Sequence, residues 1–180
     1  MYKFYSCLAL ILCLVACQSE QQKQSQMRAE IKKLERQLTT KMDTSTFQLD
    51  SKIAKELVEK SEAYAATFPK DSSSADVLFR AADMARGARN FGKAIQLWGN
   101  VHDNFPNYAR TPDALFLQAF TFENDLGDKE TAKRYYEKFL QMYPQNPIAE
   151  QVKQLLSMLD KSPEEMIKAF QAMNEKLNTK

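Results

Sequence analysis

Residues 90–106 read NFGKAIQLWGNVHDNFP, an apolar pattern of helical spacing that stops at an aromatic residue followed by proline. Proline ends a helix because its ring clashes with the preceding turn and because it has no N–H to donate. The same ending closes two other helix-patterned runs. The three pairs are Phe68-Pro69, Phe105-Pro106 and Tyr143-Pro144, separated by 37 and 38 residues. Self-similarity at this period predicts a repeat of helical hairpins.

Small residues recur at fixed distances inside each period. The first follows its preceding proline by thirteen residues, and the second lies twelve or thirteen residues further on. Two antiparallel helices approach closely where small side chains face each other, and bulky residues such as Trp98 and Tyr136 then fill the next layer. The three pairs are Ala82 with Ala94, Ala119 with Ala132, and Ser157 with Ala169. The pattern therefore predicts an all-α fold with three copies of one hairpin.

This spacing resembles the tetratricopeptide repeat (TPR), a hairpin with two small positions, a bulky position and a final proline. The first repeat fits at Ala82, Ala94, Trp98 and Pro106, and the second at Ala119, Ala132, Tyr136 and Pro144 with one residue inserted near Gly127. The third keeps Ser157 and Ala169 and lacks the proline. The resemblance implies a TPR-type helical-hairpin solenoid over residues 44–178, with a leading helix at 47–68 and divergent repeats at about 75–106, 112–144 and 147–177.

The start of the leading helix is predicted from the run DTSTF, in which residues 44–46 are candidate N-caps. Apolar residues then recur with helical spacing from Phe47 to Phe68. We therefore expect this helix to begin at residue 47 and to end before Pro69.

The N-terminus, MYKFYSCLALILCLVACQSE, has the form of a processing signal. The unbroken apolar and small run over residues 6–16 matches the hydrophobic region of a signal peptide and is too short to span a bilayer. Leu14, Val15, Ala16 and Cys17 resemble the bacterial lipobox, in which cleavage before the cysteine leaves it N-terminal and acylated. We expect a lipoprotein signal peptide at 1–16 and acyl chains, palmitate included, on Cys17. The alternative is an ordinary secretory signal with a chance cysteine.

The cysteines all lie at or before this site, as Cys7, Cys13 and Cys17. The predicted mature chain therefore has no thiol for a disulfide, a zinc site or a nucleophile. At about 0.8 kcal/mol per buried methylene, two or three acyl chains hold a protein on a membrane durably. Gln18 and Ser19 follow the cysteine in place of the aspartate that retains proteobacterial lipoproteins in the inner membrane. We therefore expect an outer-membrane anchor and a domain facing the periplasm.

Two segments separate this anchor from the repeats. Residues 17–26 are polar and predict the lipidated cysteine and a flexible tether. Met27, Ile31, Leu34 and Leu38 then recur with 4-3-4 spacing, which predicts an amphipathic helix over 27–43. Fewer than two heptads are apolar, so the main interpretation is a helix that packs on its own domain or is partly frayed. The alternative is a short coiled coil that trimerises the chain into a structural homo-oligomer between membrane and cell wall.

In the TPR family the first helix of each hairpin lines a concave groove, and this implies a peptide-binding surface here. The matching positions are Asp76, Phe79, Asp83, Arg86, Asp113, Phe116, Phe120 and Glu123. Phenylalanines among carboxylates suit the capture of an extended or helical peptide by aromatic anchors. The alternative is that the phenylalanines pack against the leading helix, or that the N-terminal amphipathic helix folds into the groove.

The sequence contains no arrangement typical of catalysis. His102 is the single histidine, and no mature cysteine could share a metal with it. The four glycines are isolated, so a Gly-rich phosphate loop is excluded. Lys and Arg number 25 against 23 for Asp and Glu, and this near balance does not favour a nucleic-acid partner. We therefore expect a protein that is not an enzyme and that needs no cofactor or metal.

The expected function is that of a membrane-anchored scaffold lipoprotein that binds a protein or peptide partner in the bacterial envelope. The connections between repeats, as in FPKDSSSAD and FPNYARTPD, carry three residues more than the standard repeat. In this respect the chain is similar to BamD-like outer-membrane assembly lipoproteins and to the TPR domain of the Tol-Pal-associated cell-division coordinator. The resemblance implies a partner in outer-membrane protein assembly or in cell-wall and division coordination.

Overall fold

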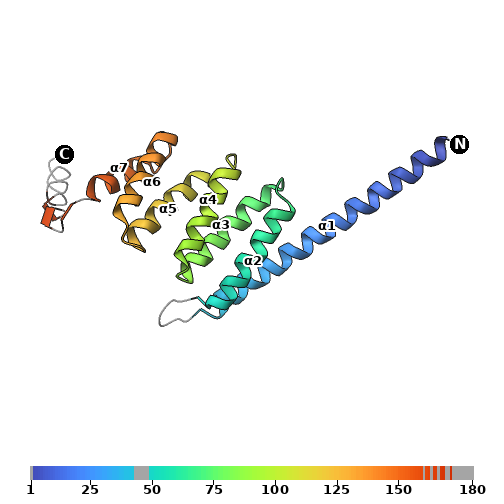
Figure 1. The fold of residues 1–180 in the computed structure, drawn as a ribbon, viewed down its shortest axis with the longest axis horizontal. Coiled ribbons are helices and arrows are strands. Elements are labelled where there is room, and N and C mark those ends of the chain that lie inside the picture. The colour runs from blue at the N-terminus through green and yellow to red at the C-terminus, as the bar shows by residue number, and fades with distance from the viewer. Residues whose placement is uncertain are drawn as a thin grey trace. The chain divides into compact units, whose positions relative to one another are not determined.

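The computed structural model describes residues 2–42 and 49–159, and near the C-terminus residues 161–162, 164–165, 167–168 and 171. Seven helices and no strand are present in these residues, which confirms the predicted all-α class (Figure 1). The helices are α1 (Tyr2–Thr40), α2 (Ser51–Thr67), α3 (Ser72–Gly87), α4 (Phe91–Asn104), α5 (Thr111–Asn124), α6 (Lys129–Met142) and α7 (Ala149–Met158). The chain divides into two compact units, Met1–Val101 and His102–Lys180.

The first unit begins with a hairpin of α1 and α2. Ile31, Leu34 and Leu38 of α1 are 2%, 7% and 0% exposed, and α2 buries Leu57 and Val58. The apolar residues predicted for the N-terminal helix are therefore buried inside its own domain. The leading helix of the sequence interpretation is thus the second helix of a further hairpin, whose first helix is α1 (Figure 1).

The flexible tether predicted for residues 17–26 is wrong as local structure, because these residues lie within α1. The stretch is rich in glutamine, which favours helix, and it contains neither glycine nor proline. One contact also holds this part of the helix. The Gln24 amide nitrogen donates to Asp71 Oδ2 at 2.8 Å, at the start of α3.

Asp71 joins three helices. Its side chain caps α3 by accepting from the Ser73 N–H at 3.0 Å, and it accepts from Gln24 of α1 and from the Tyr64 hydroxyl of α2. Burial raises the pKa of Asp71, and the hydrogen bonds from Tyr64, Ser73 and Gln24 outweigh this and hold its pKa below the usual value. Tyr64 itself is 0% exposed, so its hydroxyl depends on this acceptor.

The start of α2 differs from the prediction. The helix begins at Ser51, and its cap is Asp50, whose carboxylate accepts from the N–H groups of Lys52 and Ile53 at 2.9 and 3.1 Å. The candidate caps at 44–46 and the predicted first apolar residue, Phe47, lie outside the described residues. Asp50 has extended backbone angles, as an N-cap requires, and it satisfies two of the free N–H groups of the first turn.

The connections after the three aromatic–proline pairs have one backbone structure. Each aromatic carbonyl accepts from the N–H three residues later, and the carbonyl of that residue accepts from an N–H three residues later again. The three sets are Phe68–Asp71–Ser74, Phe105–Tyr108–Thr111 and Tyr143–Asn146–Ala149, with N···O distances between 2.9 and 3.1 Å. The hydroxyls of Ser74 and Thr111 also donate to the aromatic carbonyl, at 2.7 and 2.6 Å. The repeat seen in the sequence is therefore a repeat of hydrogen-bonded turns.

The turns inside two hairpins also correspond. Arg89 and Gly127 lie five residues before the second small residue of their repeats, and they have positive φ values of 62° and 69°. Asn90 and Asp128 follow them and accept from the N–H groups of Lys93 and Thr131. A left-handed residue followed by a capping side chain therefore starts both α4 and α6.

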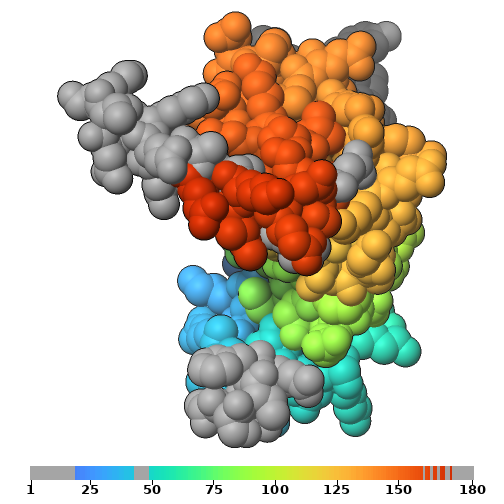
Figure 2. All heavy atoms as spheres, turned by 90° about the vertical axis from the view of Figure 1, so that its left-hand side faces the viewer, coloured from blue at the N-terminus to red at the C-terminus, as the bar shows by residue number. Residues whose placement is uncertain are grey.

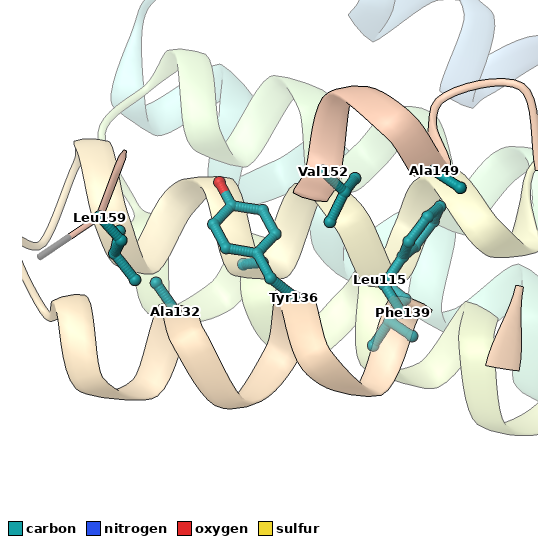
Figure 3. Packing of buried hydrophobic residues seen from close by; sticks show 8 residues of the cluster. Leu115, Ala132, Tyr136, Phe139, Ala149, Val152 and Leu159 are labelled. Atoms are coloured by element: carbon teal, nitrogen blue, oxygen red, sulfur yellow. The ribbon is translucent and has the colours of Figure 1, made fainter. Parts of the chain in front are cut away.

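The small residues lie where the helices pack. Ala82 and Ala94 in the first unit are 0% exposed, as are Ala119 and Ala132 in the second. Trp98 is 1% exposed in the first unit. Tyr136 and Phe139 of α6 extend the second core toward Val152 of α7 (Figure 3).

The third repeat departs from the expected packing. Ser157 is exposed, and its hydroxyl donates to the Gln154 carbonyl at 2.8 Å. The buried residues of this segment are Ala149, Val152 and Leu159, and their helical spacing turns Ser157 away from α6. The expected partner Ala169 lies outside the described residues. The side chains of α7, coloured red, form part of the molecular surface in Figure 2.

Candidate peptide-binding surface

The first-helix surface of the first unit is bordered by α1. Helices α1 and α3 enclose a hollow of about 460 Å³, with Ile31 and Val77 among its lining residues. These two are 2% and 3% exposed, so they form an apolar floor. Arg28 and Lys32 of α1 also line the hollow, as does Asp76, the first of the predicted groove residues. In this unit Asp76 therefore faces a helix of the same chain.

Arg80 connects the two helices across this hollow. Its Nε donates to Glu35 Oε1 of α1 at 2.8 Å, and its Nη1 donates to Asp76 Oδ2 of α3. All three side chains are partly exposed, so each ion pair adds at most about 1 kcal/mol to stability. The structural consequence is an ordered charged rim above the apolar floor.

Phe79 is not an exposed aromatic anchor, and its assignment to the groove is wrong. Its side chain is 0% exposed and meets the Trp98 ring edge-on, with ring centroids 6.5 Å apart. Phe79 therefore belongs to the buried face of α3 and contacts α4 through Trp98. Asp83 and Arg86, also predicted for the groove, are half-buried on the same helix.

Two of the predicted groove residues in the second unit are aromatic side chains that remain partly accessible. Phe116 and Phe120 are half-buried on successive turns of α5, with ring centroids 6.0 Å apart. Phe116 also packs against Tyr136 and Phe139 of α6, at 6.1 and 6.4 Å. These contacts fix the orientation of both rings while part of each remains open to solvent, which is what an aromatic anchor for a peptide requires.

The two predicted carboxylates of α5 have different surroundings. Asp113 pairs with Arg110 at 3.3 Å, and both side chains are about half exposed. Glu123 accepts from the Tyr136 hydroxyl at 2.6 Å. Burial and this carboxylate raise the pKa of Tyr136, so its hydroxyl remains a donor. Glu123 therefore links α5 to α6, and Asp113 remains at the surface.

A second hollow of the first unit was not predicted. It measures about 640 Å³ and is lined by α2, the end of α3 and the start of α4. Ala54, Val58 and Ala85 form its apolar part, and Lys93 pairs with Glu62 at its rim at 3.2 Å. The sequence gives little indication of this hollow, because small residues at the ends of helices are common. The hollow forms only where three helices meet, and the sequence does not specify that arrangement.

One comparison with known proteins identifies the repeat unit. Residues 113–146, which span nearly all of α5 and α6 and the turn after them, match the tetratricopeptide repeat family. The chain contains a tetratricopeptide repeat. Comparison with curated proteins and with solved structures found no match. The matched segment is the hairpin that the sequence interpretation assigned to the second repeat.

The TPR assignment indicates a protein-interaction scaffold. Tetratricopeptide repeat proteins are typically non-enzymatic and bind other proteins, and the match indicates no catalytic family. Within the described part of the chain, no group of three or more His, Cys, Asp or Glu side chains could hold a metal ion. His102 is buried, bonds Asp103 through Nδ1 at 2.7 Å and meets the Tyr143 ring edge-on.

The length and the apolar character of the helices can be compared with what a membrane span requires. No helix among the described residues is both long and apolar enough to cross a membrane.

Proposed function

We propose that this chain is a lipid-anchored TPR scaffold of a bacterial envelope, which binds a protein or peptide partner in outer-membrane protein assembly or in cell-wall and division coordination. The proposal that the chain binds a protein or peptide is supported by the match of residues 113–146 to the tetratricopeptide repeat. Its α5 presents Phe116 and Phe120 as ordered, half-buried rings beside the exposed carboxylate of Asp113.

The anchoring half rests on the N-terminal sequence. The apolar run over residues 6–16 leads into Leu14, Val15, Ala16 and Cys17, the order of a lipobox. Acylation at Cys17 would place the repeats at the surface of a membrane, and Gln18 with Ser19 favours the outer membrane and the periplasmic side.

The alternative of a structural trimer has less support. A trimeric coiled coil through the N-terminal helix would need Ile31, Leu34 and Leu38 at its seam. These side chains are between 0% and 7% exposed within the hairpin of α1 and α2, so the chain would have to open this hairpin first. We therefore propose a scaffold in which α1 is part of the folded domain.

The test is crosslinking of the full lipoprotein in native membranes, followed by identification of the captured proteins by mass spectrometry. Phe120→Asp should remove the specific partner and leave the melting temperature close to that of the unmodified protein. Phe91→Asp is the matched control, because Phe91 is also a half-buried aromatic residue but lies at the start of a second helix, α4. Equal capture by both variants would contradict the assignment of the α5 surface.

The anchor is tested separately by the intact mass of the membrane-extracted protein. We expect the mass of a chain that begins at Cys17 and carries acyl chains. An unprocessed or unacylated chain would refute the anchor and leave the TPR interaction unaffected.

A further inference from the structure

Charge is unevenly distributed around the second half of α1. Its two glutamates, Glu30 and Glu35, are directed to neighbouring helices, where each has a cation as a partner. Glu30 accepts from Lys60 Nζ of α2 at 2.8 Å, and Glu35 accepts from Arg80 Nε of α3 at 2.8 Å. The acidic residues of this segment are therefore neutralised within the domain.

The basic residues of the same segment have a different environment. Arg28, Lys32, Lys33 and Arg36, here called the cationic row, are all exposed. Within the part of the chain that the structure describes, none of the four lies at ion-pair distance from a carboxylate. Arg28, Lys32 and Arg36 recur every four residues and so share one side of the helix. The exposed surface of α1 thus carries four positive charges outside any close ion pair, although Arg28 and Lys32 also border the hollow that Glu35 and Asp76 line.

The apolar side of α1 is not available to a partner. Ile31, Leu34 and Leu38 are buried against the domain, so α1 cannot insert into a bilayer as a free amphipathic helix does. An interaction through its outward side has to be electrostatic, with an anionic surface as its complement.

The continuity of α1 favours a membrane as that surface. The helix runs without a break from Tyr2 to Thr40, so the cationic row belongs to the same helix as Cys17, the predicted acylation site that becomes the N-terminus after cleavage (Figure 1). A cluster of Lys and Arg next to a membrane-associated segment is attracted to anionic lipid headgroups. An acyl anchor holds a protein more durably when a polybasic patch adds a second signal.

We propose that α1 lies along the surface of an anionic phospholipid bilayer, with the cationic row against the headgroup phosphates. This inference rests on the membrane anchoring in the proposed function. With a rise of about 1.5 Å per residue, Arg28 and Arg36 are about 16 and 28 Å along the helix from Cys17. These lengths exceed the Debye length of about 8 to 10 Å, so the row reaches the headgroups only if α1 runs along the surface.

The test uses the full chain with Cys17→Ser, which cannot be acylated, and measures co-sedimentation with phosphatidylcholine vesicles and with vesicles that also contain phosphatidylglycerol. The unprocessed Cys17→Ser chain keeps the apolar residues 6–16, which we expect to bind both kinds of vesicle equally in every variant, so the quantity of interest is the ratio of the two partition coefficients. We expect a clear preference for the anionic vesicles that weakens as salt is raised. Each cation close to an anionic surface strengthens binding about fivefold, so replacing all four by glutamine should reduce the ratio roughly a hundredfold or more.

A matched control separates the position of the charges from their number. The control variant carries glutamine in place of four other exposed lysines, Lys52, Lys55, Lys70 and Lys129. Its formal net charge is lower than the original +2 by the same four units. This control should keep most of the preference for anionic vesicles. Because Arg28 also helps to lower the pKa of Asp71, a variant with only Lys32, Lys33 and Arg36 replaced is measured beside the full set, and melting curves check that all variants are folded.

Three outcomes would overturn the proposal. The first is an equal preference for neutral and anionic vesicles in the Cys17→Ser chain. The second is an equal loss in the row variant and in the control, which would assign the effect to net charge. The third is a row variant that keeps its vesicle binding but changes its mass in solution, which would make the row an interface between copies of the chain. None of these results depends on acylation, so failure of the anchor and failure of this inference are distinguishable.

Discussion

Asp71→Asn tests the junction at which α1, α2 and α3 meet. Asparagine caps a helix about as well as aspartate, so the hydrogen bond from the Ser73 N–H to the side chain should persist. The change removes the negative charge that accepts from Tyr64 and Gln24, and it places an amide at a position where two donors converge. The substitution therefore isolates the side-chain junction from the helix cap.

The expected loss in the free energy of unfolding near neutral pH is about 1 to 2 kcal/mol. A hydrogen bond to a charged group contributes about 1.5 to 3 kcal/mol when it is buried, and Asp71 is only partly buried, so the lower part of that range applies. The buried Tyr64 hydroxyl retains a partner only if the new amide reorients. Tyr64→Phe in the Asp71→Asn background should cost less than in the original chain, with a coupling of about 1 kcal/mol.

The pH dependence follows from the direction of the pKa shift. The folded state holds the pKa of Asp71 below its usual value, so its contribution to stability is complete above the unfolded pKa of about 3.9. The contribution is lost as the pH falls through the lower folded pKa. The difference between the original chain and Asp71→Asn should therefore be constant from neutral pH down to about pH 5 and should disappear in strong acid.

The assay is urea unfolding followed by tryptophan fluorescence. Trp98 is the single tryptophan and is 1% exposed in the first unit, so its signal reports the unit that contains Asp71. Asp50→Asn is the control, since the hydrogen bonds of the Asp50 side chain among the described residues come from the backbone N–H groups of Lys52 and Ile53. It should leave stability nearly unchanged. Equal stability of the two variants, or a cycle without coupling between Tyr64 and Asp71, would refute the assigned role of the junction.

Three further predictions concern the second unit, and one of them compares its turn at Gly127 with the corresponding turn at Arg89 in the first unit. Tyr136→Phe removes the hydroxyl that donates to Glu123 and should lower the free energy of unfolding by about 1 kcal/mol, measured by circular dichroism in urea. Gly127→Ala places a side chain at φ 69° and should lower the free energy of unfolding by about 1 kcal/mol. Arg89→Gly, at the corresponding position of the other turn, should not lower it. A lower free energy of unfolding in both variants would contradict the equivalence of the two turns. Phe120→Asp should abolish partner capture with little change in melting temperature, and a large fall in that temperature would assign Phe120 to the core.

Much of the fold could be predicted because its signals are local. Proline after an aromatic residue ends a helix whatever lies around it, and the same pair of hydrogen-bonded turns follows Phe68, Phe105 and Tyr143. Small residues at a fixed spacing likewise predict where two consecutive helices touch, and Ala82 and Ala119 are both buried. The start of α2 was less predictable, because several residues between 43 and 50 can cap a helix and only the backbone conformation selects Asp50.

The candidate site was predicted less well, because exposure depends on residues distant in the sequence. Phe79 and Phe116 occupy the same repeat position, three residues before the small residue, and the sequence assigned both to the groove. Phe79 is 0% exposed and packs on Trp98, whereas Phe116 is half-buried beside Phe120. The position of a residue in a helix determines the direction in which its side chain points. The neighbouring helix determines whether that side chain is buried or exposed.

The sequence by itself determined the all-α class, the period of the hairpins and the end of each second helix, since each of these follows from backbone stereochemistry over a few residues. Only the tertiary structure decided the role of α1. Its apolar spacing predicted an amphipathic helix and left its packing partner open. In the structure Glu30 and Glu35 pair with cations of α2 and α3, and among the described residues the four cations between residues 28 and 36 lie in no such pair. The physical reason is that an ion pair between helices depends on which faces pack together, and packing joins residues 30 to 45 positions apart in the chain.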